Sequence, residues 1–251
     1  MATWVEEKER FYRRMLEDIE IGYMDEDIVP LLKLFFKLPY AFTKSSCSGR
    51  ITAVDAVFPW SRDGTIVFKV HRPITEEEFV RILSKPVMHR LWLNVQGPII
   101  HVVAKDLEAA KRILELARKA GFKHSGVLVL DKHPLVELTT GVRANLLLKV
   151  RDKVVVKQVP EVVEAVNEVL MEGKRRLKRL EEVLEEEVKA LGRGLELVET
   201  SEGPRRQLRE AGQRGEDLSG EGIETVKERG DGNKLEENKE VGVRGVGKVN
   251  S

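Results

Sequence analysis

Apolar residues recur along this chain in two patterns, one with the period of a helix and one with the short runs or alternation of strands. The helical pattern predicts helices at residues 4–19, 27–38, 75–83, 107–119 and 160–191. The strand pattern predicts strands at residues 49–58, 65–71, 91–96, 99–104, 124–130, 135–142, 146–150 and 154–159. This mixed order predicts an α+β fold with a long C-terminal helix.

Capping residues support the starts of four of these helices. Thr3 with Glu6, and likewise the segment Thr75–Glu78, have the spacing of a capping box, which satisfies N–H groups of a first helical turn. Asp106 precedes the fourth helix, and we expect Asp27 to cap the second in the same way.

The order of the elements contains a possible repeat. A strand–strand–helix unit that begins at Ser48-Gly49 is followed by a second such unit, and then by Ser125-Gly126 before another strand. The pattern favours a single sheet built from a duplicated unit, with helices packed on it and a site where the two halves meet. A Ser-Gly pair before a strand is also a common turn, and taken alone that reading is favoured.

Composition divides the chain at about residue 198. Residues 199–251 contain ten Lys and Arg, twelve Asp and Glu, and half of the twenty glycines. They contain no aromatic residue. Such a segment buries too little apolar surface to offset its ordering entropy. We therefore expect a folded domain at 1–198 and a disordered tail at 199–251.

Charge and cysteine content exclude several classes of protein. Formal net charge is +1, and no run approaches the roughly eighteen apolar residues of a membrane span. The charged N-terminal residues do not resemble a signal peptide, and a single cysteine excludes an internal disulfide framework. We expect a cytoplasmic protein with no membrane association and no required protein partner.

The stretch YAFTKSSCSGRI, residues 40–51, is the most unusual chemistry in the chain. It lacks the Gly-x-Ser-x-Gly spacing of a nucleophile elbow, and no strand is predicted before it. Cys47 has no local histidine and is expected to act as a small buried hydrophobe. Consecutive hydroxyls and backbone amides followed by Arg50 suit an anionic or polar ligand.

Other local motifs exclude common cofactor sites. The histidines do not have metal-ligand spacing, so no metal is expected, and neither a Gly-x-Gly-x-x-Gly nor a P-loop motif occurs. A nucleotide-type ligand would therefore need a non-Rossmann pocket. The residues alone reach no further than an anion or polar-ligand corner in a protein that combines helices and sheet.

Three segments together resemble the tRNA wybutosine-synthesising protein 3 family. They are Ser45–Ile51, then Leu91-Trp92 leading into Gly97–Val102, and then Ala120–Gly126. The resemblance covers roughly the first 190 residues. It implies a non-Rossmann fold and an S-adenosylmethionine-dependent methyltransferase. The substrate it implies is tRNA(Phe), methylated at N4 of the tricyclic guanosine derivative at position 37, in the anticodon loop.

Candidate roles follow from the chemistry at the matching positions. We expect His101 to relay a proton, with Ser46 and Arg50 beside it as further catalytic residues. The expected cofactor-binding residues are Ser45, Ser48, Arg50, Trp92, His124 and Ser125. Arg50 would pair with a carboxylate or phosphate, and Trp92 would stack on adenine or on a flipped base, or else pack in the core.

Two other functions fit the same residues. One is a tRNA-binding module without catalysis, which would bind tRNA but no cofactor. The other is a small-molecule enzyme that uses the SSCSGR corner to hold an anion.

Overall fold

The computed structural model of the protein describes residues 3–201, which combine helices and antiparallel strands. The helices are α1 (Trp4–Glu20), η1 (Glu26–Ile28, a 3-10 helix), α2 (Val29–Lys37), α3 (Glu76–Ser84), α4 (Leu107–Lys119) and α5 (Val159–Ser201). The strands are β1 (Ala41–Cys47), β2 (Arg50–Asp55), β3 (Thr65–Val70), β4 (Arg90–Gln96), β5 (Ile99–Ala104), β6 (Gly126–Val129), β7 (Leu135–Thr139), β8 (Arg143–Val150) and β9 (Lys153–Val154). The predicted α+β class and the long C-terminal helix are confirmed.

Helix caps agree with the sequence except at one position. Both predicted capping boxes form at the starts of α1 and α3, and the Asp106 carboxylate accepts a hydrogen bond from the N–H of Ala109. The expectation for Asp27 is wrong, because Asp27 lies in η1 and α2 begins at Val29 without a side-chain cap. The Asp27 carboxylate pairs with Lys174 instead.

The predicted tail, residues 199–251, lies outside the described residues except for its first three, which continue α5. In the part of the chain that is described, none of the helices combines the length and apolar character needed to cross a membrane.

The strands form two antiparallel sheets, whereas the sequence predicted one. A four-stranded sheet has the order β1-β5-β7-β6, and a five-stranded sheet has the order β3-β2-β4-β8-β9. The two strand–strand–helix units are therefore not equivalent halves, since β2 and β3 share a sheet while β4 and β5 lie in different sheets. The single sheet built from a duplicated unit is corrected by this topology.

Three short connections explain the division, because β1–β2, β4–β5 and β7–β8 all carry the chain from one sheet to the other. Gly49 and Gly141 in two of them have φ values of +104° and +71°, a region that favours glycine. A Cβ on Gly97 in the third would lie 2.7 Å from Thr140 Oγ1. Pro98 then lacks the N–H that would continue the ladder. These three connections therefore interrupt the strand pairing, and the two sheets separate where they lie.

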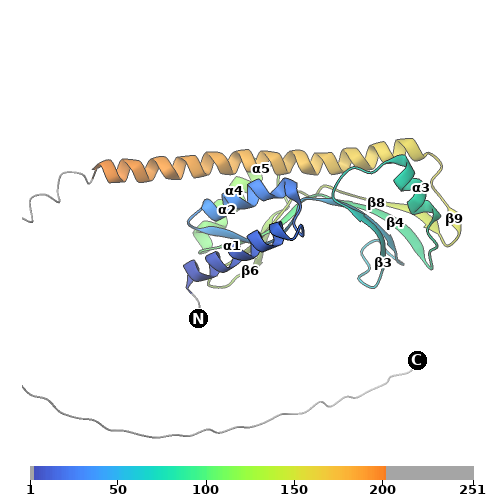
Figure 1. The fold of residues 1–251 in the computed structure, drawn as a ribbon, viewed down its shortest axis with the longest axis horizontal. Helices are drawn as coiled ribbons and strands as arrows, with labels where there is room; N and C mark the ends of the chain where they lie inside the picture. Colours follow the sequence, from blue (N-terminus) through green and yellow to red (C-terminus); the bar gives the residue numbers. More distant parts are fainter. Residues whose placement is uncertain (1–2, 202–251) are drawn as a thin grey trace, which may run out of the picture. The chain divides into compact units, whose positions relative to one another are not determined.

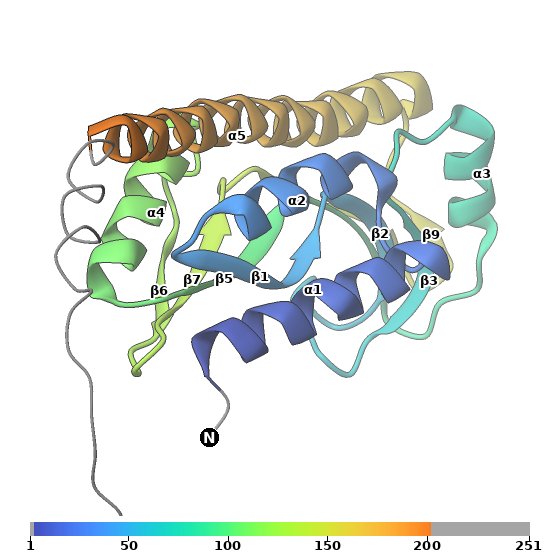
Figure 2. The same ribbon diagram turned by 60° about the vertical axis from the view of Figure 1, so that its left-hand side comes forward.

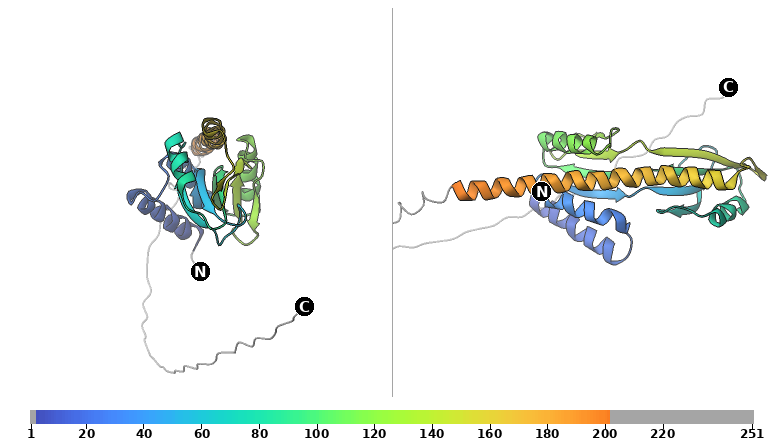
Figure 3. Two further views of the ribbon diagram at one scale, coloured as in Figure 1. Left: turned by 90° about the vertical axis from the view of Figure 1, so that its right-hand side faces the viewer. Right: turned by 90° about the horizontal axis from the view of Figure 1, so that it is seen from above.

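Helices cover one face of both sheets. Helix α5 runs along this face of the two sheets (Figures 1 and 3), with α2 and α4 packed on the four-stranded sheet and α3 on the five-stranded sheet. Along β4 every second residue is buried in this core, and the half-buried residues between them point to the opposite face. We call that opposite face, turned away from α5, the open face.

Strand β1 was not predicted, because its second half, Lys44-Ser45-Ser46-Cys47, is polar and only partly buried. It is an edge strand, paired only with β5, and α1 lies beside it (Figure 2). The SSCSGR corner therefore joins two strands at the junction between the sheets, and a strand precedes it after all.

Candidate active site

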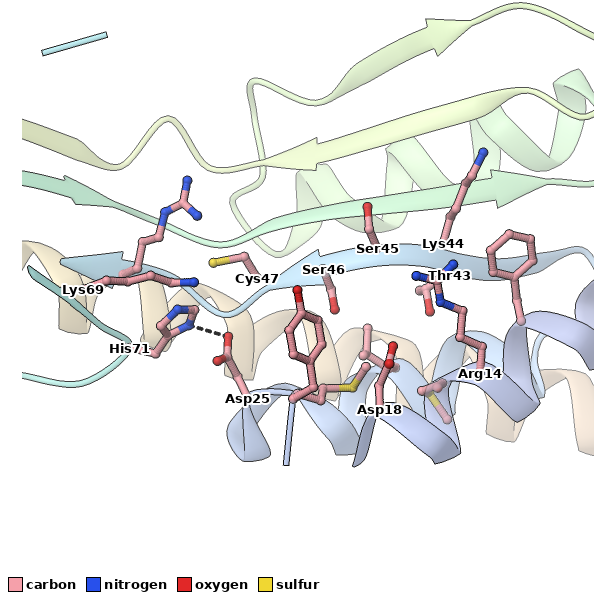
Figure 4. A pocket seen from close by; sticks show the side chains of 16 residues that line it. Arg14, Asp18, Asp25, Thr43, Lys44, Ser45, Ser46, Cys47, Lys69 and His71 are labelled. Carbon is pink, nitrogen blue, oxygen red and sulfur yellow. Dashed lines mark hydrogen bonds and ion pairs between the residues drawn. The ribbon is translucent and has the colours of Figure 1, made fainter. Parts of the chain in front are cut away.

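A cavity of about 400 Å³ lies between α1 and the edge strand β1 (Figure 4). Of the residues predicted from the sequence, Ser45, Ser46 and Arg50 line it. Phe11 and Tyr23 add aromatic rings. The cavity wall also carries four cationic side chains, Arg14, Lys44, Arg50 and Lys69, and two acidic ones, Asp18 and Asp25. The lining is thus suited to a zwitterionic molecule with a flat ring.

A bulge in β1 sets the direction of the serines. Thr43 pairs with Val102 and Ser45 with His101, so Lys44 is the extra residue of the bulge. A bulge interrupts the alternation of side chains along a strand. As a result Ser46 points toward the helices while Ser45 points toward the neighbouring strands (Figure 4).

Ser45, His101 and Glu137 form a chain of hydrogen-bonding groups across three adjacent strands. The Ser45 hydroxyl lies 2.7 Å from His101 Nδ1, and His101 Nε2 lies 3.1 Å from a Glu137 carboxylate oxygen. A carboxylate only accepts, so a neutral His101 donates through Nε2–H and accepts the Ser45 O–H at Nδ1. This arrangement can take up a proton at Nδ1 while Glu137 stabilises the resulting charge. The predicted relay residue His101 is thus hydrogen-bonded to Ser45, a residue of the cavity wall.

Sequence reasoning did not find Glu137. Its only local signal is a charged residue inside the apolar run of β7. Its pairing with His101 depends on the register between β5 and β7, which the sequence does not reveal.

A second histidine–carboxylate pair lies on the cavity wall. An Asp25 carboxylate oxygen lies 2.6 Å from His71 Nδ1 and accepts a hydrogen bond of 3.0 Å from the N–H of Ser48. Burial alone would raise the pKa of Asp25, but the bonds from Ser48 and His71 outweigh it and hold this pKa below its ordinary value. Asp25 was not predicted as a site residue. His71 was noted only as one of five histidines that lack metal-ligand spacing.

Asp25, His71 and Cys47 also place three potential metal ligand atoms within 4.8 Å of one another. The Asp25 oxygen is already shared by two donors, and the cationic Arg50 and Lys69 line the same cavity. Nearby positive charge disfavours a metal cation. The geometry therefore fits an anionic or zwitterionic ligand better than a metal.

Ser48 does not line the cavity. It is fully buried, and its hydroxyl accepts a hydrogen bond of 2.7 Å from Lys174 of α5. Lys174 also lies 2.5 Å from the Asp27 carboxylate. Ser48 thus links the SSCSGR corner to α5 and supports the cavity wall without contacting the cavity.

The remaining predicted residues also lie outside the cavity. Trp92 is half-buried on the open face, and its indole N–H donates to the carbonyl of Ala56. The Ser125 hydroxyl donates to the carbonyl of Phe122 and accepts from the N–H of Thr139.

His124 lies against Gly141, where a Cβ would approach the imidazole to 2.4 Å, and lines a separate shallow depression. The structure therefore brings Ser45, Ser46, Arg50 and His101 together. It does not bring Trp92, His124 or Ser125 to them.

Comparison with known proteins identifies the family. Residues 6–186 match the model of the family described as Methyltransferase TYW3. A curated relative from Saccharolobus solfataricus is 46% identical over 73% of this chain and 90% of its own length. Another, from Pyrococcus abyssi, is 35% identical over 73% of this chain and 98% of its own length. Both are named as tRNA(Phe) 7-((3-amino-3-carboxypropyl)-4-demethylwyosine(37)-N(4))-methyltransferases.

Solved structures agree with these sequence matches. The PH1069 protein from Pyrococcus horikoshii superposes with a TM-score of 0.67 at 32% identity, over 70% of this chain and 93% of that one. A hypothetical protein from Aeropyrum pernix has a TM-score of 0.59 at 30% identity, over 64% of this chain and 98% of that one. On this evidence of sequence and fold, the chain belongs to the TYW3 methyltransferase family.

Proposed function

We propose that the protein transfers a methyl group from S-adenosylmethionine to N4 of the demethylwyosine-type base at position 37 of tRNA(Phe). The observation that carries this proposal is the family match, together with relatives of this named activity that align over nearly their whole length. The resemblance of SSCSGR to the family adds a location, because this stretch forms one wall of the cavity beside α1.

The cavity fits the cofactor in size and in donor set. Its volume of about 400 Å³ lies within the range of small-molecule sites. Arg14 and Arg50 are placed to hold a carboxylate, Asp18 and Asp25 to hold an ammonium group, and Phe11 or Tyr23 to stack on a purine. When bound, the cofactor supplies an electrophilic methyl group on its sulfonium sulfur.

Methylation of N4 replaces a hydrogen on nitrogen, so a proton has to leave as the N–C bond forms. Ser45 lines the cavity and is bonded to His101 Nδ1. We assign Ser45 to accept this proton while it passes its own to His101. Glu137 then stabilises the imidazolium, as a carboxylate does in a catalytic triad. The remaining contribution is orientation, since Ser46 and Arg50 fix the reactants on the same wall.

The geometry of the cavity supports only some of the predicted cofactor contacts. Ser45 and Arg50 are retained as direct contacts. Ser48 supports the corner through Lys174, and no cofactor contact is assigned to Trp92, His124 or Ser125, which lie outside the cavity. The anticodon loop is the part of the tRNA that would approach, because position 37 lies beside the anticodon.

The test is methyl transfer itself. The full chain is incubated with S-adenosylmethionine and tRNA(Phe) that carries the demethylated tricyclic base, and the nucleosides are analysed by mass spectrometry. One added methyl group at this base is the expected result. Calorimetry that detects tRNA binding but no cofactor binding, even with tRNA present, would instead support the tRNA-binding module. Cofactor-independent binding of small anions without tRNA affinity would support the small-molecule enzyme.

A further inference from the structure

The connection between β2 and β3, residues 56–64, displays two exposed aromatic side chains. Trp60 is 74% exposed and Phe58 is 49% exposed. Their rings are stacked, with centroids 5.4 Å apart and planes at 4°. Tryptophan is usually well buried, so a stacked and exposed aromatic pair points to a binding role.

The loop that carries this pair is held in place by side chains of β4. Arg90 donates to the carbonyl of Val57 at 2.6 Å, Trp92 to that of Ala56 at 3.2 Å, and Asn94 to that of Pro59 at 3.1 Å. These donors are alternate residues on the open face of the strand. Three donors on one short loop fix its backbone, so the aromatic pair is presented in a set position.

The loop turns back over the open face in the direction of the cavity. Figure 1 shows it on the side of the five-stranded sheet away from α5. Asn94 of β4 bonds the carbonyl of Pro59 and pairs with Thr52 of β2. Arg50, which lines the cavity, precedes Thr52 by two residues in β2. At about 3.4 Å per residue, this places the anchor of the loop roughly 7 Å along β2 from Arg50.

The surface beside the pair is polar and cationic. Across the open face the strand register aligns Lys69, Thr52, Asn94 and Asn145, and in the next row Arg50, Gln96 and Arg143.

The acidic Asp55 at the end of β2 is taken up by the backbone N–H groups of Met88 and His89. Cationic side chains with amides suit a phosphate backbone, and aromatic faces suit unpaired bases. This complementarity favours single-stranded RNA over an apolar protein partner.

We propose that Trp60, supported by Phe58, stacks on an unpaired base of the tRNA next to the nucleotide that enters the cavity. The two rings already touch one another, so the base stacks on the free face of Trp60 and not between the rings. The inference rests on the proposed function for the identity of the RNA. It also gives Trp92 a definite task, since Trp92 positions the loop and Trp60 meets the base.

Binding of labelled tRNA(Phe) to the full chain, followed by fluorescence anisotropy without cofactor, tests this role. Trp60→Ala should weaken binding at least about fivefold, because stacking contributes about 1–3 kcal/mol per base. Phe58→Ala should weaken it less, and Trp60→Phe should retain most of the affinity. The slope of log Kd against log salt should stay that of the wild type, since no phosphate contact is removed. Ile21→Ala, an equally exposed apolar side chain outside this surface, is the matched control and should bind normally.

Several outcomes would overturn the inference. They are wild-type affinity in Trp60→Ala, an equal loss on fully duplex RNA without unpaired bases, or a change in self-association in place of tRNA affinity. Cofactor binding and methyl transfer are measured separately. A wild-type chain that binds tRNA through Trp60 but transfers no methyl group removes the proposed function and leaves this inference standing. A chain that methylates tRNA without dependence on Trp60 does the reverse.

Discussion

Two histidine–carboxylate pairs lie near β1, and they differ in the further hydrogen-bond partner that each pair has. His101 has Glu137 on Nε2 and the hydroxyl of Ser45 on Nδ1, so a proton can enter on one side while charge is stabilised on the other. His71 uses Nδ1 for Asp25, whose carboxylate also holds the N–H of Ser48. We therefore propose that the first pair moves a proton and that the second holds a wall of the cavity.

On the proposed function, a histidine beside a carboxylate is therefore not in itself a catalytic dyad. In the proposed mechanism the difference is a hydroxyl that can pass a proton to the imidazole, since His71 lines the cavity itself and its Nδ1 is taken by Asp25. Ser45 supplies this hydroxyl for His101, because it lines the cavity and bonds Nδ1 at once.

Replacement of His101 by Ala should have the largest effect. Loss of the proton acceptor should lower kcat by roughly 10²- to 10⁴-fold. The affinities for S-adenosylmethionine and tRNA, measured by calorimetry, should stay close to those of the wild type, because His101 does not line the cavity. A fall in affinity with an unchanged kcat would move His101 from the relay to the binding wall.

Glu137→Gln should have a smaller effect on the same step. The amide oxygen can still orient His101, but it does not stabilise an imidazolium charge, so kcat should fall about tenfold, or roughly 1.4 kcal/mol. Steady-state kinetics with saturating tRNA measure this change. A kcat in Glu137→Gln equal to that of the wild type would mean that orientation, and not charge, is what Glu137 supplies.

His71→Ala should act on binding and not on turnover. Removal of one hydrogen bond to Asp25, worth about 1 kcal/mol, should raise the Kd for S-adenosylmethionine roughly fivefold. At saturating cofactor kcat should match the wild type. A kcat loss that persists at saturation would show that this pair also takes part in the chemistry.

On the folding stability of the chain without cofactor, Asp25→Asn should have a small effect, visible in the pH dependence of stability. The pKa of Asp25 is lowered in the folded state, so its contribution is present above the unfolded pKa near 4 and is lost as pH falls through the folded value below it. The difference in Tm between wild type and Asp25→Asn should therefore be constant from pH 7 to about 5 and shrink toward pH 3. A difference that does not change with pH would assign the effect to packing.

Much of the fold could be predicted from local sequence. The capping boxes at Thr3 and Thr75 formed as expected, and most strands lie close to the predicted positions. Strand β1 was missed because its outer half is polar and its pairing with β5 supplies what its own composition lacks. The division into two sheets was missed because it depends on three connections that meet only in space.

The site could be predicted only in part, for the same reason. SSCSGR and His101 were predicted from residue type and from resemblance to a family, and the structure places Ser45, Ser46 and Arg50 on the cavity wall and His101 beside Ser45. Glu137 and Asp25 are ordinary acidic residues in sequence, and only strand register and the approach of Ser48 give them partners. Ser48 was predicted to contact the cofactor, but it is buried outside the cavity and its hydroxyl accepts a hydrogen bond from Lys174 of α5. The sequence does not reveal which of these two roles a serine beside a glycine has.

The most direct test of the account is a single-turnover measurement of methyl transfer, with cofactor and demethylated tRNA(Phe) both saturating, for His101→Ala and His71→Ala side by side. The account predicts a rate for His101→Ala lower than that of His71→Ala by at least about 100-fold, with His71→Ala close to the wild type. Equal rates for the two variants, or a slower His71→Ala, would contradict the assignment of the proton relay to Ser45, His101 and Glu137.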